Sequence, residues 1–191
     1  MTTIPLTKEE KGLLLKLARR SIELTVTGHR LPVLNLAEYS LPLQERGASF
    51  VTLTENSELR GCIGALEAYQ PLVQDVCEHA ADAAMEDPRF QPVRPREVSL
   101  LKIEISRLTP QVPLPYERPE DLPRLLRPGI DGVVVRDGMH RATFLPQVWE
   151  KVESPAEFLS HLCLKMGAPP NYWQKKVLQV SIYQVEEFEE E

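Results

Sequence analysis

The sequence has few of the residues from which metal and redox sites are built. It contains 3 cysteines and 4 histidines among 191 residues, and no Cys-x-x-Cys or His-x-x-x-His pair. Nothing in this spacing indicates a zinc site, and too few cysteines are present to ligate an iron–sulfur cluster. A glycine-rich phosphate loop and a nucleophile-elbow serine are also absent. We therefore expect neither a metal nor a cofactor.

Long apolar runs and an excess of positive charge are absent as well. Nowhere do about 18 consecutive apolar residues occur, the length that a membrane helix needs, and Lys8, Glu9, Glu10 and Lys11 stand where a signal peptide would be apolar. The net charge of -6 argues against a general electrostatic attraction to nucleic acid or anionic membranes. An odd number of unpaired cysteines suits a reducing compartment. We expect a cytoplasmic protein with neither of these partners.

What is present suits a globular core with rigid connections. Hydrophobic residues make up 42% of the chain, and 17 residues are proline, a share above the usual one of roughly 5%. Thr7 followed by Glu10 has the pattern of a capping box, in which each side chain satisfies a backbone donor of the other. Apolar residues then recur at helical spacing as far as Gly28. These patterns predict an N-terminal helix over about 8–27.

The rest of the chain gives one order of elements twice. Alternating residues and turn signals predict strands at 48–54 and 58–64, a helix from about 71, and a strand at 100–108. The second half repeats a hairpin at 132–145, a helix at 155–166 and a strand at 178–185. This order predicts an α+β fold built from a duplicated hairpin-helix-strand unit, with sub-units at about 48–108 and 132–186.

The segment Leu59-Arg60-Gly61-Cys62-Ile63-Gly64 is the strongest candidate for a site. Regular strand alternation would place Arg60 and Cys62 on one face, about 6–7 Å apart, and Leu59 and Ile63 in the core. A nearby arginine would favour the thiolate, so we take Cys62 and Arg60 as candidate catalytic residues. The alternative is that Cys62 is a small buried residue and that the glycines permit a bulge or close packing.

Four segments together resemble the AMMECR domain family, whose bacterial and archaeal members are named AmmeMemoRadiSam system protein A. They are Leu59–Gly64, Asp87-Pro88-Arg89-Phe90, Thr143-Phe144-Leu145-Pro146-Gln147-Val148-Trp149 and Phe158-Leu159-Ser160-His161-Leu162-Cys163-Leu164-Lys165. The resemblance spans about residues 8 to 188. It implies a single AMMECR-type domain over 1–191, with two unequal lobes and antiparallel sheets. It also implies a Memo-like protein and a radical SAM protein as partners, but it implies no reaction.

The signature segments and the second hairpin supply further candidates for binding. These are Gly61, Gly64, Asp87, Arg89, Arg141, Thr143, Pro146, Trp149 and Lys165. Several have a structural alternative. Asp87 and Arg89 could pair to end a helix, and Phe144 and Trp149 could be core residues or the lip of a groove. Cys77 and Cys163 lie among apolar helix residues and are expected in the core.

Two classes of function are consistent with these patterns. The first is a component of a Memo-like and radical SAM associated modification system that uses Cys62 to handle or transform a substrate. The second is a noncatalytic adaptor that presents the glycine-rich strand and the segment around Pro146 and Trp149 to a protein. An accessible Cys62 in a concave pocket would favour the first class. A flat apolar patch would favour the second.

Overall fold

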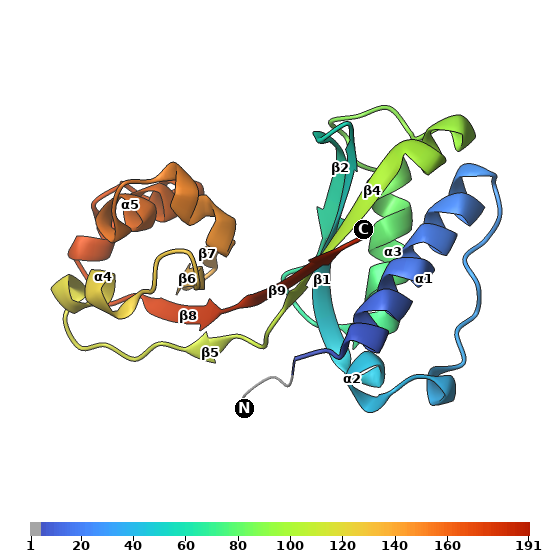
Figure 1. Cartoon of the computed structure of the whole chain (residues 1–191). Coiled ribbons are helices and arrows are strands. Elements are labelled where there is room, and N and C mark those ends of the chain that lie inside the picture. The colour runs from blue at the N-terminus through green and yellow to red at the C-terminus, as the bar shows by residue number, and fades with distance from the viewer. Residues whose placement is uncertain (1–4) are drawn as a thin grey trace. The chain divides into compact units, whose positions relative to one another are not determined.

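The computed structural model describes residues 5–191 and divides into two compact units (Figure 1). Unit 1 contains the described residues up to Thr109 and the C-terminal segment Glu186–Glu191, and unit 2 contains Pro110–Val185. Within residues 5–191, no helix has the length and apolar character that crossing a membrane requires. Because unit 1 contains both the first half of the chain and its last residues, unit 2 is formed by a continuous segment between two parts of unit 1.

Helix α1, Lys8–Val26, has both of its ends fixed by local chemistry. The Thr7 hydroxyl accepts the Glu10 N–H at 3.2 Å, and the Glu10 carboxylate accepts the Thr7 N–H at 2.8 Å, which completes the expected capping box. Gly28 ends the helix with φ of 76°, while the N–H of His29 donates to the carbonyl of Leu24. This is a Schellman ending, and it needs a residue that tolerates left-handed backbone.

Unit 1 is an antiparallel sheet with helices on one face (Figure 1). The strand order is β2-β1-β4-β9, and β3 pairs with another part of β1. Helices α1 and α3 pack on the sheet through a core that includes Leu14, Ile22, Val76 and Ile105. The remaining elements of unit 1 are η1 Leu36–Glu38, α2 Leu41–Gln44, β1 Arg46–Glu55, β2 Glu58–Gly64, β3 Gln70–Pro71, α3 Leu72–Met85, η2 Pro95–Leu100, β4 Leu101–Leu108 and β9 Val185–Glu189.

Unit 2 is a smaller antiparallel sheet in the order β5-β8-β6-β7. Its core contains Trp149, Phe158, Leu162 and Cys163, and the rings of Trp149 and Phe158 are stacked with centroids 3.7 Å apart. Ser154 caps helix α5 by accepting the Glu157 N–H. The elements are β5 Val112–Pro113, η3 Pro119–Asp121, α4 Leu122–Leu125, β6 Gly132–Asp137, β7 His140–Phe144, η4 Pro146–Lys151, α5 Pro155–Lys165, η5 Tyr172–Gln174 and β8 Gln179–Tyr183.

The two units share a topology, as the repeated order of elements predicts. In unit 1, the hairpin β1–β2 is followed by α3 and then by β4, which pairs with β1. In unit 2, the hairpin β6–β7 is followed by α5 and then by β8, which pairs with β6. All of these pairings are antiparallel, and they confirm the α+β class. Each sheet also has a fourth strand beside the returning one, β9 in unit 1 and β5 in unit 2, and unit 1 is larger because α1 and β3 are added to this common pattern.

Candidate functional site

Strand β2, which carries the Leu59–Gly64 segment, is bulged at Arg60. Gly61 pairs with Leu53 and Leu59 pairs with Thr54, so Arg60 has no counterpart on β1. A bulge adds one residue to a strand and breaks the alternation of its side chains. The regular alternation expected from the sequence is therefore wrong at Arg60. Leu59, expected in the core, is 42% exposed, whereas Ile63 packs against the core as predicted.

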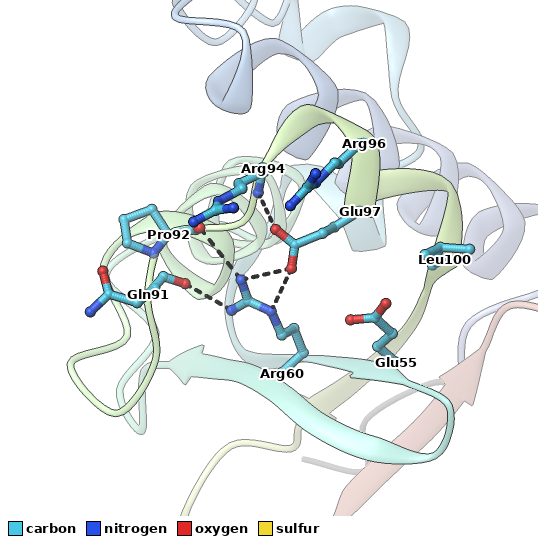
Figure 2. Close-up of a pocket in the computed structure, with 8 residues that line it drawn as sticks. All are labelled: Glu55, Arg60, Gln91, Pro92, Arg94, Arg96, Glu97 and Leu100. Atoms are coloured by element: carbon cyan, nitrogen blue, oxygen red, sulfur yellow. Dashed lines mark hydrogen bonds and ion pairs between the residues drawn. The ribbon is translucent and has the colours of Figure 1, made fainter.

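The Arg60 side chain is held on the helix-bearing side of the sheet. Its Nε and Nη2 each donate to Glu97 Oε1 at 3.1 Å, and its Nη1 donates to the carbonyl of Gln91 at 2.8 Å (Figure 2). Only 16% of the side chain is exposed. Hydrogen bonds from the Arg94 backbone and from Arg60 lower the pKa of Glu97. The charge of Arg60 is thus already paired with a carboxylate.

Cys62 faces the other side of the same sheet. It pairs in register with Thr52, whose neighbours Val51 and Leu53 point into the core beneath the helices. The Thr52 hydroxyl donates to the Cys62 Sγ at 3.4 Å, and the thiol is half-buried. Because Arg60 and Cys62 lie on opposite faces of β2, the expectation that the arginine promotes thiolate formation is wrong.

Asp87 and Arg89 clamp the outer edge of β2. The Asp87 carboxylate accepts the backbone N–H of Cys62 at 2.8 Å and pairs with the Arg89 guanidinium at 2.6 Å, and Arg89 donates to the Cys62 carbonyl at 3.3 Å. The hydrogen bonds from Arg89 hold the pKa of the nearly buried Asp87 carboxyl well below its usual range. Two motifs with 22 residues between them in the sequence thus meet at the backbone of one residue, Cys62. The side chains occupy the positions that another strand would take.

Gly61 and Gly64 are required by the protein's own packing. A Cβ atom at residue 61 would lie 2.1 Å from the carbonyl oxygen of Ala83, and one at residue 64 would lie 2.3 Å from that of Ser49. Neither position has room for a side chain, so each glycine allows backbone to approach backbone. The glycines need no ligand to explain them.

A pocket of about 430 Å³ opens beside Arg60, on the helix-bearing side of β2 (Figure 2). It lies among the end of β1, strand β2, the segment that follows α3, and η2. Cys62 does not line it. The lining residues are Glu55, Arg60, Gln91, Pro92, Arg94, Arg96, Glu97 and Leu100.

The candidates from the second half of the chain are built into unit 2. Trp149 is 7% exposed and its Nε1–H donates to the carbonyl of Asp131, while Pro146 is buried at the start of η4. Thr143 is also buried, with its hydroxyl 3.2 Å from the hydroxyl of Tyr183. Packing therefore accounts for Pro146, Trp149 and Thr143, which favours the core alternative over the lip of a groove.

Lys165 and Arg141 are associated with strand β7 of the same unit. Lys165 Nζ donates to the carbonyl of Thr143 at 3.0 Å and lies 5.0 Å from the centre of the Phe144 ring. Arg141 is half-buried and pairs in register with Arg136 of β6. The hydrogen bond from Lys165 therefore joins the end of α5 to strand β7.

A buried polar cluster in unit 1 goes beyond what the sequence indicates. The Ser49 hydroxyl donates to Asp75 Oδ2 at 2.6 Å, and His79 Nδ1 lies 3.2 Å from the same oxygen. Asp75 and His79 lie one helical turn apart on α3, a spacing at which side chains can meet on the surface of a helix. They do interact, but Asp75 is fully buried and His79 is 5% exposed. Cys77 and Cys163 are buried as expected, and burial raises the pKa of both thiols.

Comparison with known proteins agrees with this architecture and with the family resemblance. Residues 15–188 match the AMMECR1 family. A protein of Methanothermobacter thermautotrophicus is 40% identical over the full length of both chains, and Protein MK0488 of Methanopyrus kandleri is 39% identical over 97% of this chain and 91% of its own. The crystal structure of the uncharacterized protein PH0010 from Pyrococcus horikoshii superposes with a TM-score of 0.84 at 34% identity, covering 97% of this chain and 94% of that one. The chain belongs to the AMMECR1 family.

Proposed function

We propose that this protein is a noncatalytic binding component of a modification system that also contains a Memo-like protein and a radical SAM protein. The partners come from the family name AmmeMemoRadiSam. The observation that carries the noncatalytic role is the separation of Arg60 from Cys62 by the bulge in β2.

The surroundings of the thiol support this role over a nucleophilic one. A nucleophilic cysteine needs a base or a positive charge that stabilises its thiolate. The Thr52 hydroxyl that donates to Cys62 Sγ supplies neither, and Arg60 is bound to Glu97 on the other face. Arg89 also interacts with Cys62, but its charge is already paired with the Asp87 carboxylate at 2.6 Å. The carboxylate of Asp87 contacts the Cys62 backbone, where it fixes the strand.

The face of β2 away from the helices is suited to protein contact at its exposed end. Leu59 is 42% exposed there, and Thr54, its partner in register, lies between it and Lys102 of β4. The clamp of Asp87 and Arg89 holds β2 rigidly, so binding at Leu59 would cost little conformational entropy. We place the partner contact on Leu59, Thr54 and Lys102.

Direct binding to the purified Memo-like and radical SAM proteins of the same organism tests the proposal. Leu59→Glu should weaken binding to one of them by about tenfold or more, because a charge would be buried in the contact. Leu164→Glu, at a leucine 54% exposed on α5, is the matched control and should bind as the wild type does. Failure of both purified proteins to bind would contradict the proposed system.

Cys62→Ser separates the binding role from thiol chemistry. The serine keeps a similar size and can still accept a hydrogen bond from Thr52, so binding and complementation of a strain lacking the protein should be retained. Loss of complementation at normal protein levels, with binding intact, would reject the noncatalytic role and favour a thiol-dependent reaction.

A further inference from the structure

The pocket beside Arg60 is lined by more positive than negative side chains, and the two signs lie at different ends of it (Figure 2). Arg60 and Glu97 neutralise one another through two hydrogen bonds. Arg94 and Arg96 are exposed, and Arg94 interacts electrostatically with the same Glu97 carboxylate. Three arginines thus share one carboxylate, which leaves an excess of two positive charges at the end of the pocket formed by η2.

The opposite end of the pocket carries one available negative charge. Glu55, at the end of β1, is half-buried, and no described residue accepts or donates a hydrogen bond at its carboxylate. The paired Arg60 and Glu97 lie between the two ends (Figure 2), and Pro92 and Leu100, which is 60% exposed, add apolar surface to the lining. The pocket thus offers a cationic end, an anionic end and some apolar surface.

The floor of the pocket is fixed before any ligand arrives. Arg60 is held by Glu97 and by the carbonyls of Gln91 and Pro92, and Glu97 also accepts the Arg94 N–H at 2.8 Å. Arginine pairs well with phosphate because its planar donors match the phosphate oxygens. The volume of about 430 Å³ lies in the range of small-molecule sites.

The geometry points to this pocket as a binding site for a small phosphorylated amine, with the phosphate on Arg94 and Arg96 and the amine on Glu55. A doubly charged phosphate matches the two arginines, and an ammonium group matches the carboxylate. The site lies on the face of β2 opposite Cys62, so it is independent of the proposed partner surface. Arg60 acts here as a positioning residue that keeps Glu97 and the loop in place.

Calorimetric titration of the full chain with aminoalkyl phosphates of increasing spacer length, starting with O-phosphoethanolamine, tests the assignment. At least one of them should bind more tightly than inorganic phosphate, because only the aminoalkyl compounds reach Glu55. An aminoalkyl carboxylate with the same spacer length should bind more weakly than the corresponding aminoalkyl phosphate. No aminoalkyl phosphate binding better than inorganic phosphate, or a carboxylate binding equally well, would overturn the assignment.

Variants then locate the binding. Arg94→Gln with Arg96→Gln should weaken binding of every phosphate by about tenfold or more, whereas Glu55→Gln should weaken only the aminoalkyl phosphates. Arg30→Gln removes an exposed arginine outside the pocket and is the matched control. Equal losses in the Arg30 variant and in the Arg94 and Arg96 double variant would mean nonspecific charge attraction and would reject the site. Unchanged melting temperatures show that each variant is folded.

Discussion

Gly61 packs directly against the backbone of α3, because a Cβ atom at residue 61 would lie 2.1 Å from the carbonyl oxygen of Ala83. A carbonyl in a helix cannot move aside as a flexible side chain can. Gly12, in the interior of α1, differs, since nothing lies within 4 Å of its added Cβ. Substituting alanine at both positions therefore distinguishes a steric clash of the new Cβ atom from the effect of glycine on backbone flexibility.

Gly61→Ala should lower the free energy of unfolding by about 1–3 kcal/mol, because the strand and helix must separate. Gly12→Ala should raise it by up to about 1 kcal/mol, since alanine favours a helix and meets no obstacle. Urea denaturation of both variants measures the two effects. Equal and small changes would show that the approach of β2 to α3 is not tight.

Asp87→Asn tests the clamp at the edge of β2. The substitution should cost about 2 kcal/mol at pH 7, because the Cys62 N–H and Arg89 lose a charged acceptor. Arg89 is 54% exposed, so water compensates part of the loss. Asp121→Asn, in an ion pair on the surface with Arg118, should cost less than about 1 kcal/mol.

The clamp also predicts a pH dependence. The folded pKa of Asp87 lies below the unfolded value of about 3.9, so its contribution is complete above that value and is lost as the pH falls below it. The difference in stability between wild type and Asp87→Asn should therefore shrink below about pH 4. A constant difference between pH 7 and pH 3, measured by urea denaturation, would contradict the role of the charge.

At the level of elements, the buried stripe of α3 joins the helix to the sheet. Cys77 is 3% exposed on this helix, near the core residues Val76 and Ala80. Cys77→Ser should lower the free energy of unfolding by about 1–3 kcal/mol, because a hydroxyl on this apolar stripe is costly to bury even with the Ser21 side chain beside it. Cys62→Ser should change it by less than about 1 kcal/mol, because the site is half-buried and keeps Thr52 as its partner. Thermal melts of the two variants measure the effects. A larger loss of stability for Cys62→Ser than for Cys77→Ser would contradict the placement of Cys77, and not Cys62, in the core.

At the level of the whole molecule, the C-terminal segment returns to unit 1. Phe188 packs on the core of unit 1, Glu186 accepts the Leu6 N–H, and Glu190 pairs with Arg19. Deleting residues 186–191 should therefore destabilise unit 1 selectively. Both tryptophans, Trp149 and Trp173, lie in unit 2, whereas the long helices α1 and α3 lie in unit 1.

Two spectroscopic signals can follow the units separately during urea denaturation of the truncated chain. The unfolding transition followed by the circular dichroism of the helices should occur at a lower urea concentration than in the wild type. The midpoint of the transition followed by tryptophan fluorescence should change less. Equal movement of both transitions would mean that the two units unfold as one cooperative structure.

The sequence by itself determines the elements and their order, because capping, turn chemistry and apolar periodicity act over a few residues. The capping box at Thr7 and Glu10, the stop at Gly28 and the repeated hairpin, helix and strand are all of this kind. The tertiary structure decides what the candidate residues contact. Only the pairing of β1 with β2 reveals the bulge that separates Arg60 from Cys62, and only folding brings Asp87 and Arg89 to the Cys62 backbone. Such contacts depend on strand register and on residues far apart in the chain, and neither is encoded in a local pattern.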